Sequence, residues 1–222
     1  MRSSAMQMRN KSDLTLYIVD DDERTYRKLA GLLASLSYRL RVFDSGEAFL
    51  DQANVGGHGC VVLDMRMAGM NGLQVHDQLL QLKSPLKVLF LSGHGTIENA
   101  VASLNKGAVD WLVKKPPDET FIDKGEDIYK IIEKVDVAMK KAAEEAGFRA
   151  LWEQLTDREK EVARLVRNGM RNQGIANLLG ISVRTVESHR GRMYEQLFPG
   201  QEGKDKRNIL ELNRMMEACK LD

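Results

Sequence analysis

The sequence lacks any run of about 18 apolar residues, the length that a helix needs to cross a bilayer. Residues 1–11 are polar and contain no apolar stretch of the kind found in a secretory signal. The sequence therefore argues against membrane proteins and exported proteins. We expect the protein to reside in the cytoplasm and to have no membrane partner.

Cysteine is scarce, and charge of one sign is not in excess. Cys60 and Cys219 lie far apart and lack the close spacing of metal-binding or redox-active pairs. We interpret both as reduced thiols that pack in a core. The 33 basic residues face 32 acidic ones, which leaves a net charge of +1. Overall charge thus does not indicate a nucleic-acid partner.

The composition is that of a folded protein, because 43% of the residues are hydrophobic and 29% are charged. At roughly 100–150 residues per domain, a chain of this length accommodates two domains. We predict a first domain at residues 13–123, an amphipathic helix and linker at 124–150, and a second domain at 151–222.

Short apolar runs alternate with amphipathic stretches in the first domain. Helical spacing of apolar residues is clearest at 26–35, 72–82 and 97–106. Near-continuous apolar strands are buried on both faces, as in parallel sheets covered by helices. The predicted fold is α/β, a doubly wound five-stranded parallel sheet of the flavodoxin-like type. Its strands are predicted at residues 14–19, 38–43, 60–63, 86–91 and 109–113.

Only helical patterns follow the first domain. Between residues 128 and 146, apolar residues recur at helical spacing with lysine and glutamate between them, which predicts one long amphipathic helix. From residue 151 onward, helical stretches are separated by glycine-containing segments at 169–171, 180–182 and 199–203. We therefore predict that the second domain is all-α and contains four helices.

Chemically active side chains follow four of the predicted strands, at the sheet edge where parallel sheets bind ligands. Carboxylates that converge there repel one another unless a cation lies among them, and such oxygen ligands favour Mg²⁺. A metal ion, a hydroxyl group and an ammonium group around one carboxylate are what phosphoryl transfer requires. The residues that follow the strands are Asp20, Asp21 and Asp22, then Asp64, then Ser92, and then Lys114 and Lys115.

Each of these aspartates also has a simpler interpretation. Aspartate often forms turns and helix N-caps after strands. The combination of acidic, hydroxyl and cationic residues at one sheet edge is less easily explained in that way. Asp22 is the carboxylate left over, and we expect it at the surface or as a helix cap.

Residues 14 to about 135 resemble the receiver domain of a bacterial two-component response regulator. The resemblance implies that a histidine kinase phosphorylates Asp64. It also implies that Asp20, Asp21 and Asp64 bind Mg²⁺ with help from the backbone carbonyl of Arg66. The matching motifs are Ile18-Val19-Asp20-Asp21, Val62-Leu63-Asp64-Met65-Arg66-Met67, Gly69-Met70-Asn71-Gly72, Leu91-Ser92-Gly93-His94-Gly95 and Gly107-Ala108-Val109-Asp110-Trp111.

The resemblance further implies a switch pair and a lysine contact. The hydroxyl of Ser92 would be drawn to the phosphoryl group while Trp111 turns inward, and a lysine would contact the phosphoryl oxygens. In this family one lysine normally precedes a proline directly, whereas this chain has Lys114-Lys115-Pro116. Spacing from Trp111 selects Lys114 and adjacency to the proline selects Lys115, and we prefer Lys114.

A second departure from the family lies at Ala68, where proline is usual. We expect this change to loosen the loop after Asp64. Together with the extra lysine, it leaves open a regulator whose receiver acts without phosphorylation. Phosphorylation assays separate that alternative from the first interpretation.

The second domain contains a helix, a short glycine turn and a further helix, which is the skeleton of a DNA-binding helix-turn-helix. Thr156 and Glu159 have the spacing of a capping box at the start of an earlier helix. Ser182 is the expected N-cap of the last helix of this motif, which ends near Leu197. Helical hairpins of this kind also occur in purely structural bundles.

The stretch at 183–197 has two different faces when drawn as a helix. Arg190 and His189 lie toward its apolar side, where we expect Arg190 to extend its head outward and His189 to pack or hydrogen-bond. The opposite side combines short polar groups with cations, which suits a major groove and its phosphates. The apolar side carries Val183, Val186, Met193 and Leu197, and the polar side carries Arg184, Ser188, Gly191 and Arg192, with Glu187 at its edge.

Residues 155–197 resemble the helix-turn-helix of LuxR/NarL-type regulators, and the resemblance covers Gly169, Ile175-Ala176, Leu178 to Ser182 and Thr185 to His189. It implies that this domain binds double-stranded DNA. Base-edge contacts fall to Glu187, Ser188 and Gly191, although Gly191 offers no side chain, so specificity there would come from DNA shape or from neighbours. We count Arg184, Thr185 and Arg192 as further DNA-binding residues.

A stripe on the last helix has two interpretations. Ile209, Leu212, Met216 and Cys219 recur at helical spacing. The stripe forms either a dimer face, for which Ile209, Leu212 and Met216 are the candidates, or the packing surface of the helix within its own domain.

The two resemblances imply a phosphorylation-controlled, DNA-binding transcription regulator and not an enzyme. Phosphorylation of Asp64 would shift a two-state receiver and promote homodimers that bring two recognition helices to adjacent half-sites. The alternative from another class is a metal-dependent phosphatase with an aspartate nucleophile, suggested by Asp20-Asp21-Asp22. That enzyme needs another carboxylate pair after a later strand, and residues 117–150 have helical patterns instead.

Overall fold

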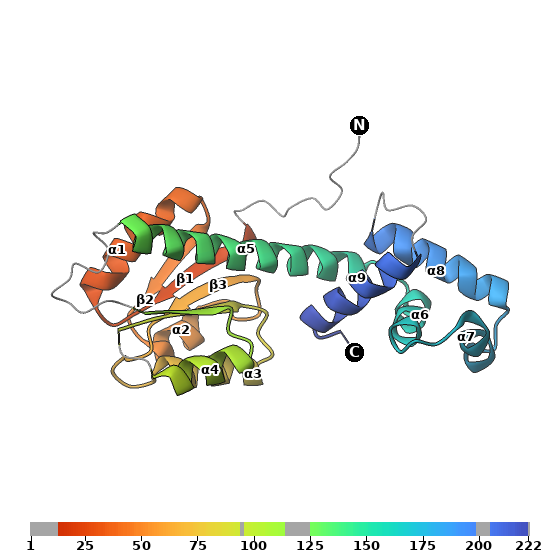
Figure 1. The fold of residues 1–222 in the computed structure, drawn as a ribbon, viewed down its shortest axis with the longest axis horizontal. Coiled ribbons are helices and arrows are strands. Elements are labelled where there is room, and N and C mark those ends of the chain that lie inside the picture. Colours follow the sequence, from red (N-terminus) through yellow and green to blue (C-terminus); the bar gives the residue numbers. More distant parts are fainter. Residues whose placement is uncertain (1–12, 94–95, 114–124, 199–204, 222) are drawn as a thin grey trace. The chain divides into compact units, whose positions relative to one another are not determined.

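A computed structural model describes residues 13–93, 96–113, 125–198 and 205–221 of the chain. The described residues up to Ala143 form one compact unit, which contains the sheet, and those from Glu144 form a second, helical unit (Figure 1). The predicted fold class, a parallel α/β sheet followed by an all-α domain, is confirmed. The division lies inside the segment 124–150 that we predicted as helix and linker.

The sheet unit is built on five parallel strands in the order β2-β1-β3-β4-β5. Val19 of β1 lies opposite Leu63 of β3, and Phe90 of β4 lies between Leu63 and Trp111 of β5. Because the strands are parallel, their carboxyl ends lie at the same edge of the sheet. All five predicted strands are present. Their bounds are β1 (Thr15–Val19), β2 (Arg39–Phe43), β3 (Gly59–Leu63), β4 (Lys87–Ser92) and β5 (Asp110–Val113).

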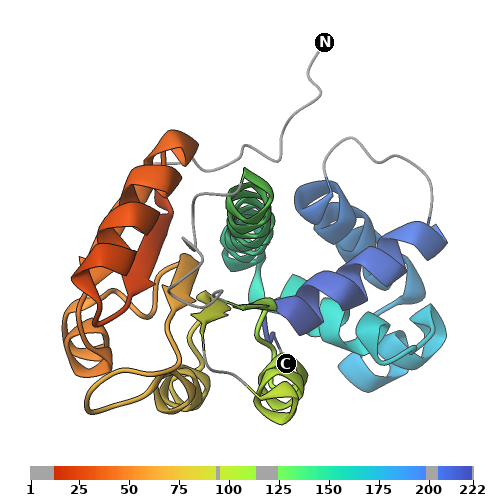
Figure 2. The same ribbon diagram turned by 60° about the vertical axis from the view of Figure 1, so that its left-hand side comes forward.

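Helices cover both faces of this sheet (Figure 2). The helix α1 (Glu23–Leu33), followed by the short 3-10 turn Ala34–Leu36, lies on one face together with the first part of α5 (Gly125–Glu153). The other face carries α2 (Gly46–Gln52), α3 (Gly72–Gln81) and α4 (Ile97–Asn105). This is the doubly wound arrangement that the alternating sequence pattern predicts.

Strand β1 illustrates why the apolar runs are continuous. Leu16 and Ile18 pack in the core beneath α1 and α5, whereas Tyr17 and Val19 pack in the core on the opposite face. Successive side chains of a strand point to opposite faces, so a strand covered on both sides needs an apolar residue at every position.

Among the described residues of the sheet unit, α2 is the one helix for which the sequence pattern predicts no residue range. It has seven residues, and Phe49 is its only large side chain that is fully buried. Phe49 packs edge-on against Tyr17 and Phe43, with ring centroids 5.4 and 5.6 Å apart. Two turns are too short to establish a helical periodicity.

The helical unit consists of the end of α5 and four further helices. The predicted capping box is present, because Thr156 accepts the amide of Glu159 and Glu159 accepts the amide of Thr156. Ser182 is the N-cap of α8 and accepts the amide of Thr185 at 3.1 Å. The predicted loop at 199–203 lies outside the described residues. The four helices are α6 (Asp157–Arg167), α7 (Asn172–Leu179), α8 (Val183–Leu197) and α9 (Asp205–Ala218).

One helix, α5, contributes to the cores of both units. Val135 and Met139 are buried against the sheet, while Phe148 and Trp152 are buried in the core of the helical unit. The predicted long amphipathic helix is therefore confirmed, and it continues through the segment predicted as linker. Its last turns belong structurally to the helical unit.

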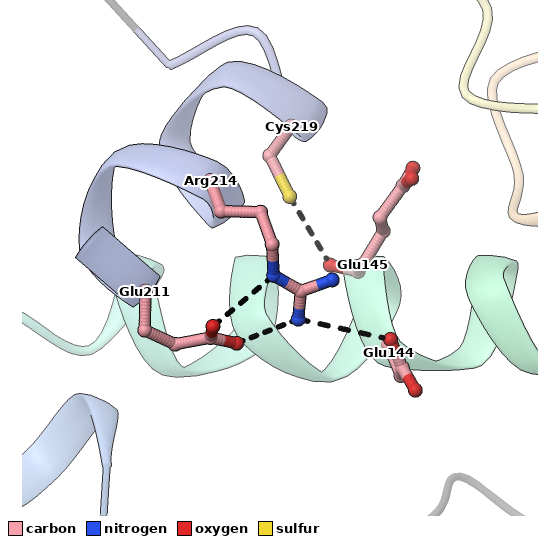
Figure 3. Close-up of polar contacts among 5 residues, drawn as sticks. All are labelled: Glu144, Glu145, Glu211, Arg214 and Cys219. Atoms are coloured by element: carbon pink, nitrogen blue, oxygen red, sulfur yellow. Dashed lines mark hydrogen bonds and ion pairs between the residues drawn. The ribbon is translucent and has the colours of Figure 1, made fainter. Parts of the chain in front are cut away.

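Polar contacts hold α9 on these last turns of α5 (Figure 3). Arg214 pairs with Glu211 on its own helix at 2.6 Å and reaches Glu144 on α5 at 4.0 Å. The thiol of Cys219 donates to the carbonyl oxygen of Glu145 at 3.5 Å. The ion pairs are partly exposed and each contributes little on its own.

The apolar stripe on α9 lies in the core of the helical unit and not on its surface. Leu212, Met216 and Cys219 are buried there, and Ile209 is half-buried against the same core. The dimer-face interpretation is therefore wrong for this stripe, since side chains inside their own domain offer no surface to a partner. The alternative, packing within the domain, is what the structure contains.

Both cysteines are reduced and buried, as predicted. Burial raises the pKa of the Cys60 thiol to about 12, and an apolar thiol of this kind is unreactive. Within the described part of the chain, no helix is long and apolar enough to pass through a membrane.

Candidate functional site

Three carboxylates converge at the carboxyl edge of the sheet. Asp20 and Asp21 follow β1, and Asp64 follows β3, its neighbour in the sheet. Each offers one oxygen atom, and these oxygens lie within 4.8 Å of one another. Asp20 is 2% exposed and Asp64 is 7% exposed, whereas Asp21 is open to solvent. The predicted grouping of these three residues is present in the fold.

Backbone amides hold each carboxylate in place. These bonds offset part of the mutual repulsion, but three negative charges, two of them buried, remain within a few ångströms. A hard divalent cation such as Mg²⁺ matches this all-oxygen donor set, so the residues present fit the metal. The amide N–H of Asp22 donates to Asp20 at 3.0 Å, that of Arg66 to Asp64 at 2.9 Å and that of Ala68 to Asp21 at 2.9 Å.

The loop between β3 and α3 is tied at two points. The N–H of Ala68 reaches Asp21, and the N–H of Met70 donates to Glu47 on α2 at 2.7 Å. Proline has no N–H and could not make the first of these bonds. The alanine therefore supplies a tie that proline would lack, and the expectation of a looser loop at Ala68 stays a prediction. No sequence signal singled out Glu47, which acts from a helix that the pattern did not resolve.

Gly72 presses the start of α3 against the main chain of Asp64. A Cβ atom at this position would lie 2.2 Å from the carbonyl oxygen of Asp64. The N–H of Gly72 donates to the carbonyl of Met65 at 3.0 Å, and Asn71 caps the helix. Gly72 belongs to one of the motifs of the receiver resemblance, but the sequence predicts no role for it, since a close backbone approach leaves no periodic signal.

The proposed switch residues lie at the same edge of the sheet. Ser92 ends β4 and is buried, and Trp111 on β5 is half-buried. The indole ring of Trp111 stacks on Phe90, with centroids 4.8 Å apart and planes 28° apart. Lys114 and Lys115, the candidates for the phosphoryl contact, lie outside the described residues, as does His94.

Asp22 is a helix cap, as expected. It precedes α1 and accepts the amide of Arg24 at 3.1 Å and the hydroxyl of Thr25 at 2.7 Å. Asp22 is exposed and is not among the three carboxylates that share the cluster.

The two faces of α8 differ in burial as the helical wheel of its sequence predicts. Val186, Met193 and Leu197 are buried in the core of the helical unit, and Val183 is partly buried. All six candidate DNA-binding residues are on the exposed side. They are Arg184, Thr185, Glu187, Ser188, Gly191 and Arg192.

The inner flank of α8 is fixed to the neighbouring helices. Arg190 donates to the side chain of Asn172 on α7 at 2.5 Å, and its guanidinium lies 5.9 Å from the ring centre of Tyr194. Arg190 thus binds within the domain and does not extend its head outward as expected. Its partner lies 18 residues earlier, on another helix, and the wheel of a single helix does not include it.

Glu159 on α6 faces the same flank of α8. Burial opposes its ionisation, but hydrogen bonds from Thr156 and the nearby charges of His189 and Arg192 outweigh burial and lower the pKa of Glu159. The capping box of α6 therefore contains a carboxylate whose pKa is lowered in part by residues of α8, the candidate recognition helix.

Comparison with known proteins accounts for both halves of the chain. The model of the response regulator receiver domain matches residues 16–126, and the model of bacterial regulatory proteins of the luxR family matches residues 153–198. The chain belongs to the response regulators with a LuxR-type DNA-binding domain. The sheet unit carries the receiver match, and the helical unit carries the DNA-binding match.

This response regulator is similar along most of its length to regulators of the same type. It is 38% identical over 190 residues to the tetrathionate response regulatory protein TtrR of Salmonella typhimurium, covering 84% of this chain and 87% of that protein. It is 34% identical over 186 residues to the transcriptional regulatory protein FixJ of Rhizobium meliloti, covering 84% and 90%. The solved structure of the response regulator StyR matches with a TM-score of 0.52 at 28% identity, covering 91% of this chain and 99% of that one.

These similarities confirm the regulator predicted from the sequence. A receiver domain joined to a LuxR-type domain is the composition of a DNA-binding transcription regulator under phosphorylation control. The phosphatase alternative requires a carboxylate pair after a later strand, and among the described residues β5 is followed by helices alone.

Proposed function

We propose that Asp64 of this response regulator accepts a phosphoryl group from a sensor histidine kinase. Mg²⁺ would be held by Asp20, Asp21, Asp64 and the backbone carbonyl of Arg66. The observation that carries the proposal is the cluster of three carboxylates, two of them buried, at the carboxyl edge of the sheet. Such a cluster is costly to maintain without a cation.

The transfer is an in-line displacement at phosphorus. A carboxylate oxygen of Asp64 forms a bond to phosphorus as the bond from phosphorus to the donor histidine nitrogen breaks, and the histidine leaves with that electron pair. Mg²⁺, when held by these residues, would neutralise the charge on the phosphoryl oxygens. The N–H of Arg66 holds Oδ2 of Asp64 and thereby fixes the plane of the attacking carboxylate. Lys114, or Lys115, contacts the phosphoryl oxygens.

Phosphorylation acts by shifting a two-state equilibrium of the receiver. The hydroxyl of Ser92 is drawn to the phosphoryl group, and Trp111 leaves its present stacking on Phe90 to turn inward. Ser92 is buried at the end of β4, and Trp111 is half-buried in β5, the neighbouring strand. Their closeness supports a role in which they act together. The change reaches the surface at the last strand and helix of the receiver.

The face formed by α4 and the end of β5 supports homodimer formation on activation. Ile97, Val101 and Leu104 follow one another at the spacing of one face of α4, and Ile97 is 82% exposed. Val113 at the end of β5 is also exposed. Apolar side chains in this arrangement favour contact with a partner, and a second copy of the receiver is the partner that a two-fold DNA site requires.

The exposed side of α8 is the proposed DNA-reading surface. Arg184 and Arg192 would contact phosphates, which fixes the position of the helix on double-stranded DNA. Base edges would be read by Thr185, Glu187 and Ser188, while the backbone at Gly191 can approach the groove closely. The core beneath α8 and the bond from Arg190 to Asn172 hold this surface in place.

Replacement of both Arg184→Ala and Arg192→Ala is expected to weaken binding to all DNA sequences about equally. A hydrogen bond to a charged group contributes about 1.5 kcal/mol, so the affinity falls about tenfold per arginine. The slope of log affinity against log salt falls by about 0.9 for each lost phosphate contact. Fluorescence anisotropy at several salt concentrations measures both quantities. Lys220→Ala is the control, because Lys220 is an exposed cation outside α8. Unchanged affinity of the double variant would contradict the placement of α8 in the DNA groove.

The chemistry itself is tested by intact mass after incubation with Mg²⁺ and acetyl phosphate. The parent protein is expected to gain one phosphoryl group, and Asp64→Ala to gain none, because the substitution removes the accepting oxygen. Absence of any gain in the parent would contradict the proposal and favour the regulator that acts without phosphorylation. Equal gain in both proteins would assign the phosphoryl group to another residue.

A further inference from the structure

Asp21 is positioned differently from its two neighbours in the carboxylate cluster. Asp20 and Asp64 are buried, and each accepts an amide from two residues further along its own loop. Asp21 is exposed, so burial does not restrict its side chain. Its described hydrogen bond comes from Ala68, 47 positions away in the loop after β3.

The bond from Ala68 leaves one oxygen of Asp21 for another ligand. The amide donates to Oδ2 at 2.9 Å, and a carboxylate can accept at both oxygens. Hydrogen bonds from the protein commonly orient the side chains that bind a metal. In a carboxylate, one oxygen then accepts from the protein donor while the other binds the metal. The energetic benefit is that the exposed side chain loses its rotamer freedom before the metal arrives.

We propose that the backbone amide of Ala68 positions Asp21 for the divalent cation and thereby raises the affinity of the receiver for Mg²⁺. This inference rests on the proposed function, because it takes the carboxylate cluster as the Mg²⁺ site. The opposite effect is also physically defined. If the amide instead competed with the metal for Asp21, its removal would strengthen metal binding.

The side chain at position 68 has no part in this role. Ala68 is exposed, and any residue except proline carries the N–H that donates to Asp21. The proposal therefore separates variants by their backbone chemistry. Ala68→Pro removes the donor, whereas the conservative Ala68→Ser retains it.

The test measures Mn²⁺ binding to the full-length protein by electron paramagnetic resonance, with Mn²⁺ as the probe for the oxygen-ligand site. We expect the dissociation constant of Ala68→Pro to rise about tenfold, the lower end of the effect of losing an outer contact to a metal ligand. Ala68→Ser should bind as the parent does. A third protein, in which an ester replaces the amide between Met67 and Ala68, removes the N–H without a proline ring and should match Ala68→Pro.

Stability without metal provides the second readout. A purely structural role of the bond would lower the unfolding midpoint in EDTA and leave the Mn²⁺ dissociation constant unchanged, which would overturn the proposal. Parental or tighter Mn²⁺ binding by the ester protein would also overturn it, including the case in which Ala68→Pro alone is weakened. If Asp64→Asn bound Mn²⁺ as tightly as the parent protein does, the assignment of the Mg²⁺ site itself would be wrong, and this inference with it.

Discussion

Phe148→Ala is expected to lower the free energy of unfolding of the helical unit by about 3–5 kcal/mol, the cost of truncating a buried phenylalanine. Phe148 lies on α5, yet its ring packs beside Trp152 and Phe198 in the helical core, with centroids 6.4 and 6.1 Å apart. A domain of this size has a total stability of only several kcal/mol. The substitution should therefore leave a large part of the helical unit unfolded at 37 °C.

The two tryptophans of the chain allow each unit to be followed separately. Trp111 lies in the sheet unit and Trp152 in the helical unit. In a Trp111→Phe background, urea unfolding monitored by fluorescence reports the helical unit alone. Leu210→Ala is the control, since Leu210 is an apolar residue of α9 in the helical unit that is 71% exposed. Its effect should stay within about 0.5 kcal/mol.

An unchanged midpoint for Phe148→Ala would mean that the helical unit is complete without the end of α5. The neighbouring contacts argue otherwise. Arg149 donates to the carbonyl of Cys219, and Ala146 and Glu145 are buried. Loss of Phe148 should therefore also reduce DNA affinity, because α8 is built on the same core.

The end of α5 illustrates what a sequence pattern can and cannot predict. Helical spacing of apolar residues from 128 to 146 predicted the helix correctly. The same spacing does not say against which core each turn packs, and so Phe148 was assigned to a linker. The stripe on α9 has the same ambiguity, because Leu212 and Met216 would look identical in sequence at a dimer face and in a domain core.

The carboxylate cluster was predictable because strand order converts sequence into position. Residues that follow buried parallel strands meet at one edge whatever the details of the loops, so Asp20, Asp21 and Asp64 could be grouped in advance. The loop contacts could not be predicted. A backbone donor such as Ala68 has no signature in its side chain, and its partner lies 47 residues away.

The buried and exposed faces of the candidate recognition helix, α8, were predictable for a related reason. The faces of α8 are set by a period of 3.6 residues within one helix, and burial of Val186 and Met193 confirms that period. Arg190 departs from the expected behaviour because its partner Asn172 belongs to another helix. Local periodicity predicts which side of a helix is buried, and tertiary contacts determine what a polar group on that side does.

Gly72→Ala is expected to destabilise the sheet unit by more than about 2 kcal/mol, whereas the same substitution at Gly31 should stabilise it. The new Cβ at position 72 would lie 2.2 Å from the Asp64 carbonyl oxygen, and backbone cannot rotate away as a side chain can. Gly31 is exposed within α1 and has no atom within 4 Å of an added Cβ. There alanine is favoured by about 0.5–1 kcal/mol through its helix propensity and the less flexible unfolded chain.

Trp111 fluorescence in a Trp152→Phe background measures both glycine variants in urea, and the opposite signs make each the control of the other. The clash at position 72 also has a chemical consequence. Relief requires α3 to move away from Asp64 or Asp64 to shift with its loop, and either movement disturbs the carboxylate whose plane the Arg66 amide fixes. Gly72→Ala should therefore be phosphorylated by acetyl phosphate more slowly than Gly31→Ala even where both are fully folded. Equal rates would mean that the main chain at Asp64 tolerates the displacement, and that the close approach of Gly72 serves packing alone.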